Sequence, residues 1–248
     1  PVIVKPPSET PLTGLAIAYL AEKAGFPPGV YNTITTTDNA EIGKELCENK
    51  KVRKLSFTGS TAVGKILMQQ CAPTLKKLSL ELGGNAPFIV FEDADIDAAV
   101  KGAIISKFRN SGQTCVCVNR IYAQDNIYDE FVEKLSTAIG RLRVGNGLDK
   151  DVEIGPLINE KGLNKVKHHI QDAVEKGAKV KIGGKHMSGL FFEPTVLTDA
   201  TPEMIISQQE VFGPVAPVFR FSTEDEAIRM ANDTDFGLAS YFYSKDVA

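Results

Sequence analysis

The sequence has few of the residues that build metal sites or disulfide frameworks. Its 248 residues include no tryptophan, three histidines and four cysteines. So few cysteines in a chain of this length predict no disulfide framework, and none of them stands near a histidine that would complete a zinc site. No apolar run approaches the roughly 20 residues of a membrane span. We therefore expect no bound metal and no membrane partner.

Positive charge is not in excess either. The formal net charge is −3, so nothing indicates binding to nucleic acid or to an anionic membrane. His168 and His169 stand in a lysine-rich stretch. We expect both histidines on a solvated helix face rather than in a metal or catalytic site.

Strand-like and helix-like segments alternate along the chain, which predicts an α/β fold with parallel strands. Hydrophobic residues make up 43% of the sequence, an ordinary share for a globular protein. Strands are expected at residues 2–4, 30–34, 54–58, 75–80, 86–91, 179–182, 191–197, 215–221 and 239–243. Helices are expected over residues 12–20, 39–48, 63–71, 96–104, 127–140, 160–176 and 224–232.

Cys115 is the most informative residue. It follows a Gly-Gln step behind an amphipathic helix that we expect to deliver it, which is typical of a presented nucleophile. A structural thiol is the better interpretation of Cys47 and Cys71, which lie on helix stripes. Glu81 stands earlier in the chain beside a Gly-Gly turn, where water can reach it. A thiol nucleophile and a carboxylate base are the groups that a covalent thioester route needs.

A glycine-containing turn around Gly59 follows an expected strand and opens a helix. Such a turn lets a phosphate approach bare backbone amides and the positive end of the helix dipole. Gly59, Gly64 and Lys65 nearly match a Walker A loop, but Ile66 stands where a hydroxyl must bind magnesium. A plain strand-to-helix turn remains the alternative.

Together with the string at residues 107–117 and the Glu-Val-Phe-Gly-Pro string at 210–214, these segments resemble the aldehyde dehydrogenase superfamily and, within it, the succinate-semialdehyde dehydrogenases. The resemblance covers essentially all 248 residues. It implies an aldehyde dehydrogenase-like α/β fold. Residues 1–83 would be the C-terminal half of a Rossmann-type nucleotide-binding domain, and residues 84–248 most of a catalytic domain that is truncated at its C-terminus.

The resemblance also implies a reaction, the oxidation of succinate semialdehyde to succinate with NAD(P)+ as hydride acceptor. Cys115 would form a thiohemiacetal and then a thioester, with its backbone amide helping to hold the oxyanion, and Glu81 would activate the hydrolytic water. Two alternatives stay open: another semialdehyde such as glutarate semialdehyde, and an inactive fragment of such an enzyme. A Walker-type nucleotide hydrolase is disfavoured by Ile66.

Further site residues are implied by the same resemblance. Gly59 and Ser60 would contact the cofactor pyrophosphate, Leu82 the nicotinamide through its backbone, and Glu210 with Phe212 the nicotinamide ribose. Lys5 and Ser8 would reach the adenosine ribose. Because NAD-preferring members commonly carry Glu at the second of these positions, and a carboxylate would repel a 2′-phosphate, Ser8 predicts NADP as the cofactor, with NAD as the alternative.

Two residues beside the nucleophile carry additional hypotheses. The resemblance implies that Arg109 helps to bind the far carboxylate of the substrate; a surface ion pair is the alternative. Cys117 could form a strained, easily reduced disulfide with Cys115 and act as a redox switch, or it could be a small packed residue.

The chain begins at Pro1 without an initiator methionine and ends just after a strand-like run. We expect both ends to be cut from a longer protein, and the piece alone to be inactive. The parent is expected to be a homo-oligomer, a dimer or tetramer, acting on a small aldehyde. A cytoplasmic location is expected, and a mitochondrial one stays open because the true N-terminus is absent.

Overall fold

The computed structural model describes residues 1–246 and divides into two compact units, Pro1–Leu82 and Gly83–Ala248, which we call units 1 and 2. The division falls immediately before the Gly-Gly pair. Val247 and Ala248, which belong to the expected second domain, lie outside the described residues.

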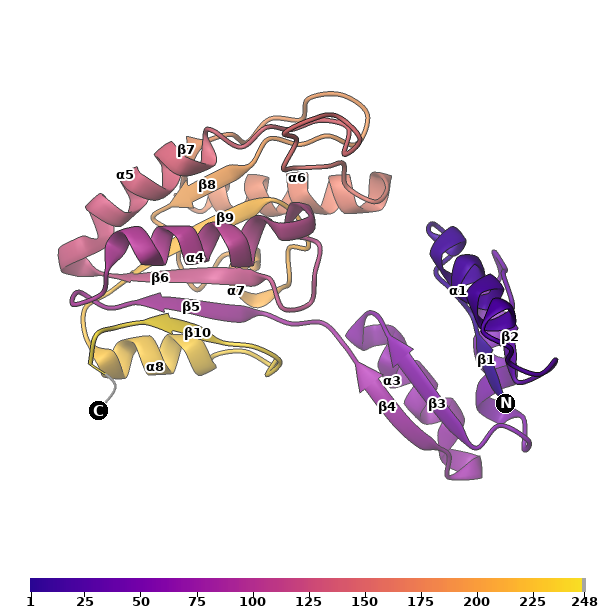
Figure 1. Cartoon of the computed structure of the whole chain (residues 1–248). Coiled ribbons are helices and arrows are strands. Elements are labelled where there is room, and N and C mark those ends of the chain that lie inside the picture. The colour runs from indigo at the N-terminus through magenta and orange to yellow at the C-terminus, as the bar shows by residue number, and fades with distance from the viewer. Residues whose placement is uncertain (247–248) are drawn as a thin grey trace. The chain divides into compact units, whose positions relative to one another are not determined.

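Unit 1 contains two pairs of parallel strands with helices between them (Figure 1). Strand β1 (Val2–Val4) pairs with β2 (Tyr31–Thr33), and β3 (Lys54–Thr58) pairs with β4 (Lys77–Glu81). The connecting helices are α1 (Pro11–Lys23), α2 (Asn39–Glu48) and α3 (Thr61–Cys71). A small core joins α2 and α3 to the second pair of strands through Cys47, Leu67, Cys71, Leu55, Phe57 and Leu78. The two cysteines expected to be structural are therefore buried.

Unit 2 is built on one six-stranded sheet in the order β10-β5-β6-β9-β8-β7. Every neighbouring pair is parallel except β7 and β8. The strands are β5 (Ala86–Val90), β6 (Val118–Gln124), β7 (Lys179–Ile182), β8 (Thr195–Thr198), β9 (Val215–Phe221) and β10 (Tyr241–Tyr243).

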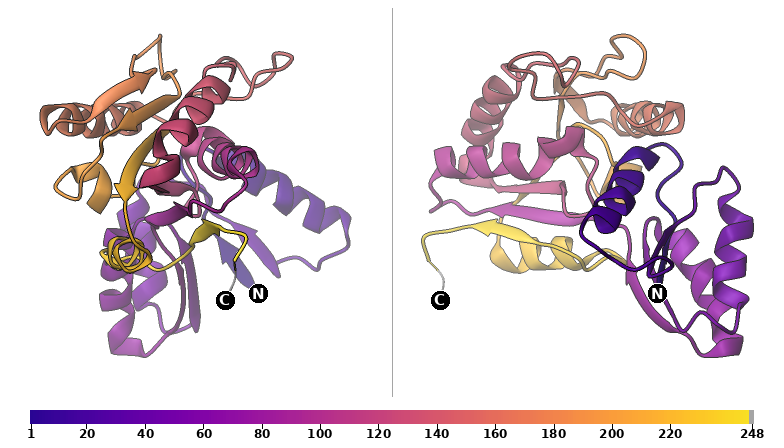
Figure 2. Two further views of the ribbon diagram at one scale, coloured as in Figure 1. Left: turned by 90° about the vertical axis from the view of Figure 1, so that its left-hand side faces the viewer. Right: turned by 45° about the vertical axis from the view of Figure 1, so that its right-hand side comes forward.

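Helices cover both faces of this sheet, and the two faces have separate cores (Figure 2). Helices α4 (Ile96–Phe108) and α5 (Tyr128–Ile139) pack on one face; α6 (Glu160–Glu175) and α8 (Glu224–Asn232) pack on the other, near the short helix α7 (Ile205–Gln208). Strand β6 alternates between the cores, with Ile121 in the first and Tyr122 in the second.

The sequence patterns missed or misplaced several features. Strand β6 was not expected, because Asn119 and Arg120 break its apolar pattern, yet both side chains are buried. The strand expected at residues 191–197 is β8, at Thr195–Thr198, and the helix α7 was not expected. His169 does not lie on a solvated face: it is 1% exposed in the second core, whereas His168 is exposed.

Candidate active site

The segment that carries Cys115 begins with a left-handed turn. Helix α4 ends at Phe108, and the next residues include Asn110, Ser111 and Gly112 with φ of 51°, 57° and 75°. This conformation is unfavourable for residues with a side chain. The Ser111 hydroxyl stabilises it by donating to the Gly155 carbonyl at 2.9 Å. The amphipathic pattern predicted that the helix would deliver Cys115 directly. Instead, the left-handed turn lies between the end of α4 and Cys115.

The side chain of Gln113 fixes the next step of the chain. Its Nε2 donates to the Pro156 carbonyl at 3.2 Å, and its Oε1 accepts from the Ile158 backbone N–H at 2.9 Å. Because one amide both donates to and accepts from the same loop, the segment before Cys115 is held at a fixed distance from residues 156–158.

Residues 114–117 form a tight turn, which we call the nucleophile turn. The Cys117 N–H donates to the Thr114 carbonyl at 3.0 Å. Cys115 is half-buried, whereas Cys117 is buried with its Sγ 2.8 Å from the Thr114 Oγ1. Within residues 1–246, the backbone N–H groups of Cys115 and Val116 have no hydrogen-bond acceptor. Unpaired amides beside a thiol are suitable donors for an oxyanion.

The carboxylate of Glu210 is connected to the nucleophile turn through Gly84. Its Oε1 accepts from the Gly84 N–H at 3.2 Å, and the α-carbon of Gly84 lies against the Cys115 carbonyl without room for a side chain. Asn119 clamps the segment on both sides of this carboxylate, because it donates to the Gln209 carbonyl at 3.1 Å and accepts from the Val211 N–H at 2.9 Å. Burial raises the pKa of Glu210, and the Gly84 N–H and nearby lysines partly oppose this.

A buried lysine lies close to these groups. Lys107, on α4, is 1% exposed, and burial lowers its pKa to about 8, while Cys117 and Glu210 favour its charged form. Lys165, on α6, also has a pKa lowered by burial and is attracted by Glu210. Lysines on two helices therefore favour the charged form of Glu210, against the effect of burial.

Arg109 is exposed at the start of the left-handed turn, and its carbonyl accepts a long contact from the Cys117 Sγ at 3.8 Å. Among the described residues its guanidinium makes no ion pair with a carboxylate. Within residues 1–246, the ion pair that was the alternative for this residue is not formed. Phe212, by contrast with the buried Val211, is 37% exposed and has a φ of 55°.

Glu81 and the expected phosphate-binding turn lie together in unit 1. Glu81 is exposed at the end of β4, and its backbone carbonyl accepts from the Gly59 N–H at 2.9 Å. Ser60 caps α3, since its hydroxyl accepts from the Val63 N–H at 3.4 Å. A Cβ on Gly64 would lie 2.5 Å from the Leu82 side chain, so this glycine lets α3 approach Leu82 closely. Bare amides at a capped helix start fit a pyrophosphate.

Lys5 and Ser8 converge on one side-chain oxygen. The Lys5 Nζ and the Ser8 hydroxyl donate to Asn39 Oδ1 at 2.6 and 3.1 Å, and Ser8 also contacts the Thr36 carbonyl at 2.9 Å. Ser8 does not cap α1, because Thr10 occupies that position. An ammonium, a hydroxyl and an amide at the end of β1 fit a phosphorylated ribose.

The sequence-predicted residues thus form two groups. Lys5, Ser8, Gly59, Ser60, Glu81 and Leu82 belong to unit 1, and Arg109, Cys115, Cys117, Glu210 and Phe212 belong to unit 2. Sequence reasoning missed Asn119, the burial of Lys107, and Tyr241, whose hydroxyl donates to the Val116 carbonyl at 2.9 Å. No motif marks Asn119 or Tyr241, and the string at residues 107–117 gave Lys107 no role of its own, since each acts through groups that are distant in the chain.

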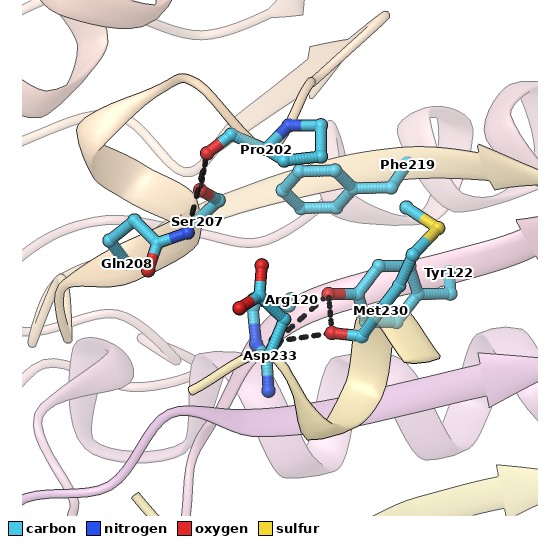
Figure 3. Close-up of a pocket in the computed structure, with 8 residues that line it drawn as sticks. All are labelled: Arg120, Tyr122, Pro202, Ser207, Gln208, Phe219, Met230 and Asp233. Carbon is cyan, nitrogen blue, oxygen red and sulfur yellow. Dashed lines mark hydrogen bonds between the residues drawn. The ribbon is translucent and has the colours of Figure 1, made fainter. Parts of the chain in front are cut away.

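A small cavity in unit 2 lies away from these groups. It has a volume of about 20 Å³, which is room for roughly one water molecule, and Figure 3 shows its lining, including Arg120, Tyr122 and Asp233. An open groove of about 510 Å³ runs past Leu238 and Tyr241.

Among the described residues no helix is long and apolar enough to cross a membrane, and no three His, Cys, Asp or Glu side chains gather as a metal site.

The comparisons with known proteins agree with this architecture. The model of the aldehyde dehydrogenase family matches residues 1–248, so the chain belongs to that family. It is 58% identical to a glutarate-semialdehyde dehydrogenase of Pseudomonas aeruginosa, covering 100% of this chain and 51% of the relative. It is 57% identical to the succinate-semialdehyde dehydrogenase [NADP(+)] of Escherichia coli, covering 100% of this chain and 52% of that relative.

A solved structure shows the same fold. The succinate-semialdehyde dehydrogenase from Burkholderia pseudomallei superposes with a TM-score of 0.98 at 56% identity, covering 100% of this chain and 52% of that one. The expected aldehyde dehydrogenase-like α/β fold is thereby confirmed. The chain spans about half the length of the curated relatives it matches.

Proposed function

We propose that this chain carries the nucleophile and part of the cofactor site of an NADP-dependent dehydrogenase that oxidises a semialdehyde with a terminal carboxylate, with succinate semialdehyde as the first candidate. The observation that carries the substrate class is Arg109. Its guanidinium has no carboxylate partner among the described residues, and its backbone contacts the nucleophile turn. A guanidinium fork is suited to a planar carboxylate.

The chemistry follows from the side chains. The Cys115 thiolate attacks the aldehyde carbon, and the free N–H groups of the nucleophile turn stabilise the resulting oxyanion. A nicotinamide in the cofactor site would supply the hydride acceptor that converts the Cys115 adduct to a thioester. Glu81 then takes a proton from the water that attacks the Cys115 thioester, which releases the acid and the thiol.

Residues in each unit are candidates for holding the cofactor. Gly59, whose own N–H donates to the Glu81 carbonyl, leaves room for the pyrophosphate to approach the backbone amide of Ser60, and Glu210 supplies a carboxylate for the ribose of the nicotinamide. Lys5 and Ser8 supply donors for a 2′-phosphate and present no carboxylate that would repel it. The name of the Escherichia coli relative, which carries NADP(+), supports this choice.

A second candidate is glutarate semialdehyde, because the Pseudomonas aeruginosa relative bears that name at 58% identity. The two substrates differ by one methylene, which is worth only roughly 10–200-fold in specificity. Sequence identity to the relatives therefore does not select between the two substrates. A comparison of kcat/KM for the four-carbon and the five-carbon semialdehyde would.

The test uses the full-length protein. Reduced cofactor is followed at 340 nm with both semialdehydes and with an uncharged aldehyde of similar length. We expect Cys115→Ala to be inactive, and Arg109→Gln to raise the KM for the semialdehydes by about 100-fold while leaving the uncharged aldehyde unchanged. Arg143→Gln, an exposed arginine paired with Asp151 at 2.7 Å, is the matched control. Equal losses on charged and uncharged aldehydes in Arg109→Gln would contradict the substrate class.

Cofactor choice has its own variant. Ser8→Glu places a carboxylate where a 2′-phosphate would lie, so the ratio of kcat/KM for NADP over NAD should fall by at least about tenfold. An unchanged ratio would remove Ser8 from the proposal.

A further inference from the structure

The peptide unit between Val116 and Cys117 is held at both of its polar groups. Its C=O accepts a hydrogen bond from the Tyr241 hydroxyl at 2.9 Å, and its N–H donates to the Thr114 carbonyl at 3.0 Å. A peptide unit is planar, so its C=O and N–H cannot turn independently. The bond from Tyr241 and the bond that closes the nucleophile turn therefore support the same orientation.

Tyr241 reaches the nucleophile turn from a distant part of the chain. It is the first residue of β10, the edge strand, and pairs with Phe88 of β5, whose ring centroid lies 6.3 Å from its own. The backbone and the ring of Tyr241 are therefore both held by β5, independently of the contact between the hydroxyl and Val116. Burial raises the pKa of the Tyr241 phenol; Cys117 and Cys115 add to this and Arg109 opposes it, so the phenol keeps the proton that it donates.

The other carbonyl groups of the turn are constrained by different elements. Thr114 accepts from within the turn, and the Cys115 carbonyl faces the α-carbon of Gly84. Of these three carbonyl groups, that of Val116 is held by a hydrogen bond from a side chain. If that bond is lost, the Val116–Cys117 peptide is free to rotate, and the N–H that closes the turn rotates with it.

We propose that Tyr241 is a positioning residue for the nucleophile: by holding the Val116 carbonyl it keeps the turn closed, with Cys115 presented and Cys117 buried. The effect on catalysis rests on the proposed function, whereas the effect on the turn does not. Tyr241 acts on the nucleophile through the backbone alone, by its hydrogen bond to the Val116 carbonyl.

The chain supplies a matched control in Tyr243. It lies two residues along the same strand, so its side chain is on the same face, and its ring centroid is 5.2 Å from the same Phe88. Its hydroxyl faces Gly102 on α4 instead of the turn. Tyr241→Phe and Tyr243→Phe remove the same atom from one strand, but only the first removes a bond to the nucleophile turn.

Two measurements on the full-length protein test the proposal. In amide hydrogen exchange read by mass spectrometry with residue-level fragmentation, Tyr241→Phe should speed exchange of the Cys117 N–H by about tenfold, and Tyr243→Phe should match the wild type. In steady-state assays with the preferred semialdehyde, Tyr241→Phe should lower kcat by about tenfold and change KM less than twofold, with Tyr243→Phe again unchanged.

The outcomes separate this proposal from the proposed function. Unchanged exchange at Cys117 in Tyr241→Phe overturns it, and so does faster exchange with an unchanged kcat, because the hydrogen bond would then be structural only. Faster exchange with a lowered kcat, specific to Tyr241, supports it. If the wild-type protein oxidises no aldehyde, the proposed function fails, and the exchange comparison still decides whether Tyr241 holds the turn.

Discussion

The α-carbon of Gly84 lies directly against the backbone carbonyl of Cys115, so that a Cβ at position 84 would overlap the oxygen atom. The N–H of the same glycine donates to the Glu210 carboxylate at 3.2 Å. One residue without a side chain therefore joins the proposed nucleophile to the proposed ribose-binding carboxylate. Its backbone can approach both groups only because it is glycine.

Gly84→Ala is therefore expected to disable the site without unfolding unit 2. Moving the Cys115 carbonyl by about 1 Å displaces the thiol, and a displacement of this size costs about 100-fold in kcat. Steady-state assay of the full-length variant checks this. Gly237→Ala is the control, since a Cβ there meets no atom within 4 Å. A Gly84→Ala enzyme with wild-type kcat would show that the turn tolerates the shift.

Arg120 is expected to be essential for stability. It is 1% exposed, and its guanidinium donates to the carbonyls of Asn85, Met230 and Ala231 at 2.8–3.0 Å (Figure 3 shows its setting). The last two carbonyls lie in the final turn of α8, where a cation is favoured by the helix dipole. Arg120→Met removes the guanidinium donor from the Asn85 and Ala231 carbonyls, whereas the Met230 carbonyl keeps the Tyr122 hydroxyl as a donor at 3.2 Å. We expect the free energy of unfolding to fall by about 3 kcal/mol.

Urea unfolding followed by circular dichroism measures this difference. Arg143→Met is the comparison, because Arg143 is an exposed side chain in an ion pair with Asp151 and should contribute less than about 1 kcal/mol. Equal midpoints for the two variants would contradict the role given to Arg120.

The Cys115–Cys117 pair remains a predicted redox switch. Both thiols are free in the structure, and Cys117 is buried against the Thr114 hydroxyl. Hydrogen peroxide should take two electrons and two protons from the thiols, leaving one disulfide and water. The product should weigh about 2 Da less by intact mass and should be restored by dithiothreitol.

Cys117→Ala is the control for that experiment. Its remaining thiol should proceed to sulfinic acid, which dithiothreitol does not reverse. Equal peroxide sensitivity and equal recovery in the variant and the wild type would mean that Cys117 is only a packed residue.

His169 is expected to make unit 2 less stable as the pH falls. Among the described residues its buried Nδ1 has no hydrogen-bond partner, and burial, with help from Lys165 and His168, lowers its pKa from the ordinary 6.5 to about 4. Between these two values the unfolded chain takes up the proton and the folded chain does not. The stabilisation is therefore fully present above about pH 6.5 and is lost as the pH falls towards 4.

The loss between pH 7.5 and 5 should be on the order of 2 kcal/mol. Urea unfolding at several pH values should show a smaller loss for His169→Gln by about that amount. His168→Gln, on the exposed side of the same helix, should keep the wild-type dependence. Identical pH profiles for all three proteins would mean that His169 is protonated as easily in the folded chain as in the unfolded one.

Much of the fold could be predicted from local pattern. Alternating apolar residues and glycine turns placed β3, β5 and β9, and the helical stripe placed α5 and α6 within a residue or two of the expected ranges. The candidate nucleophile and base were found in the same way, since Cys115 follows a Gly-Gln step and Glu81 precedes a Gly-Gly turn. The strand and helix signals are local because burial along an element repeats with the period of that element.

Tertiary structure alone decided which polar residues are buried and what they hold. Strand β6 escaped prediction because Arg120 and Asn119 break its apolar pattern, and their burial is favourable only where carbonyls from α8 and the Glu210 segment meet them. The bond from Tyr241 to Val116 joins residues 125 positions apart. A sequence pattern shows which groups can donate or accept, whereas partners so distant in the chain are chosen only when the strands pair and the faces pack.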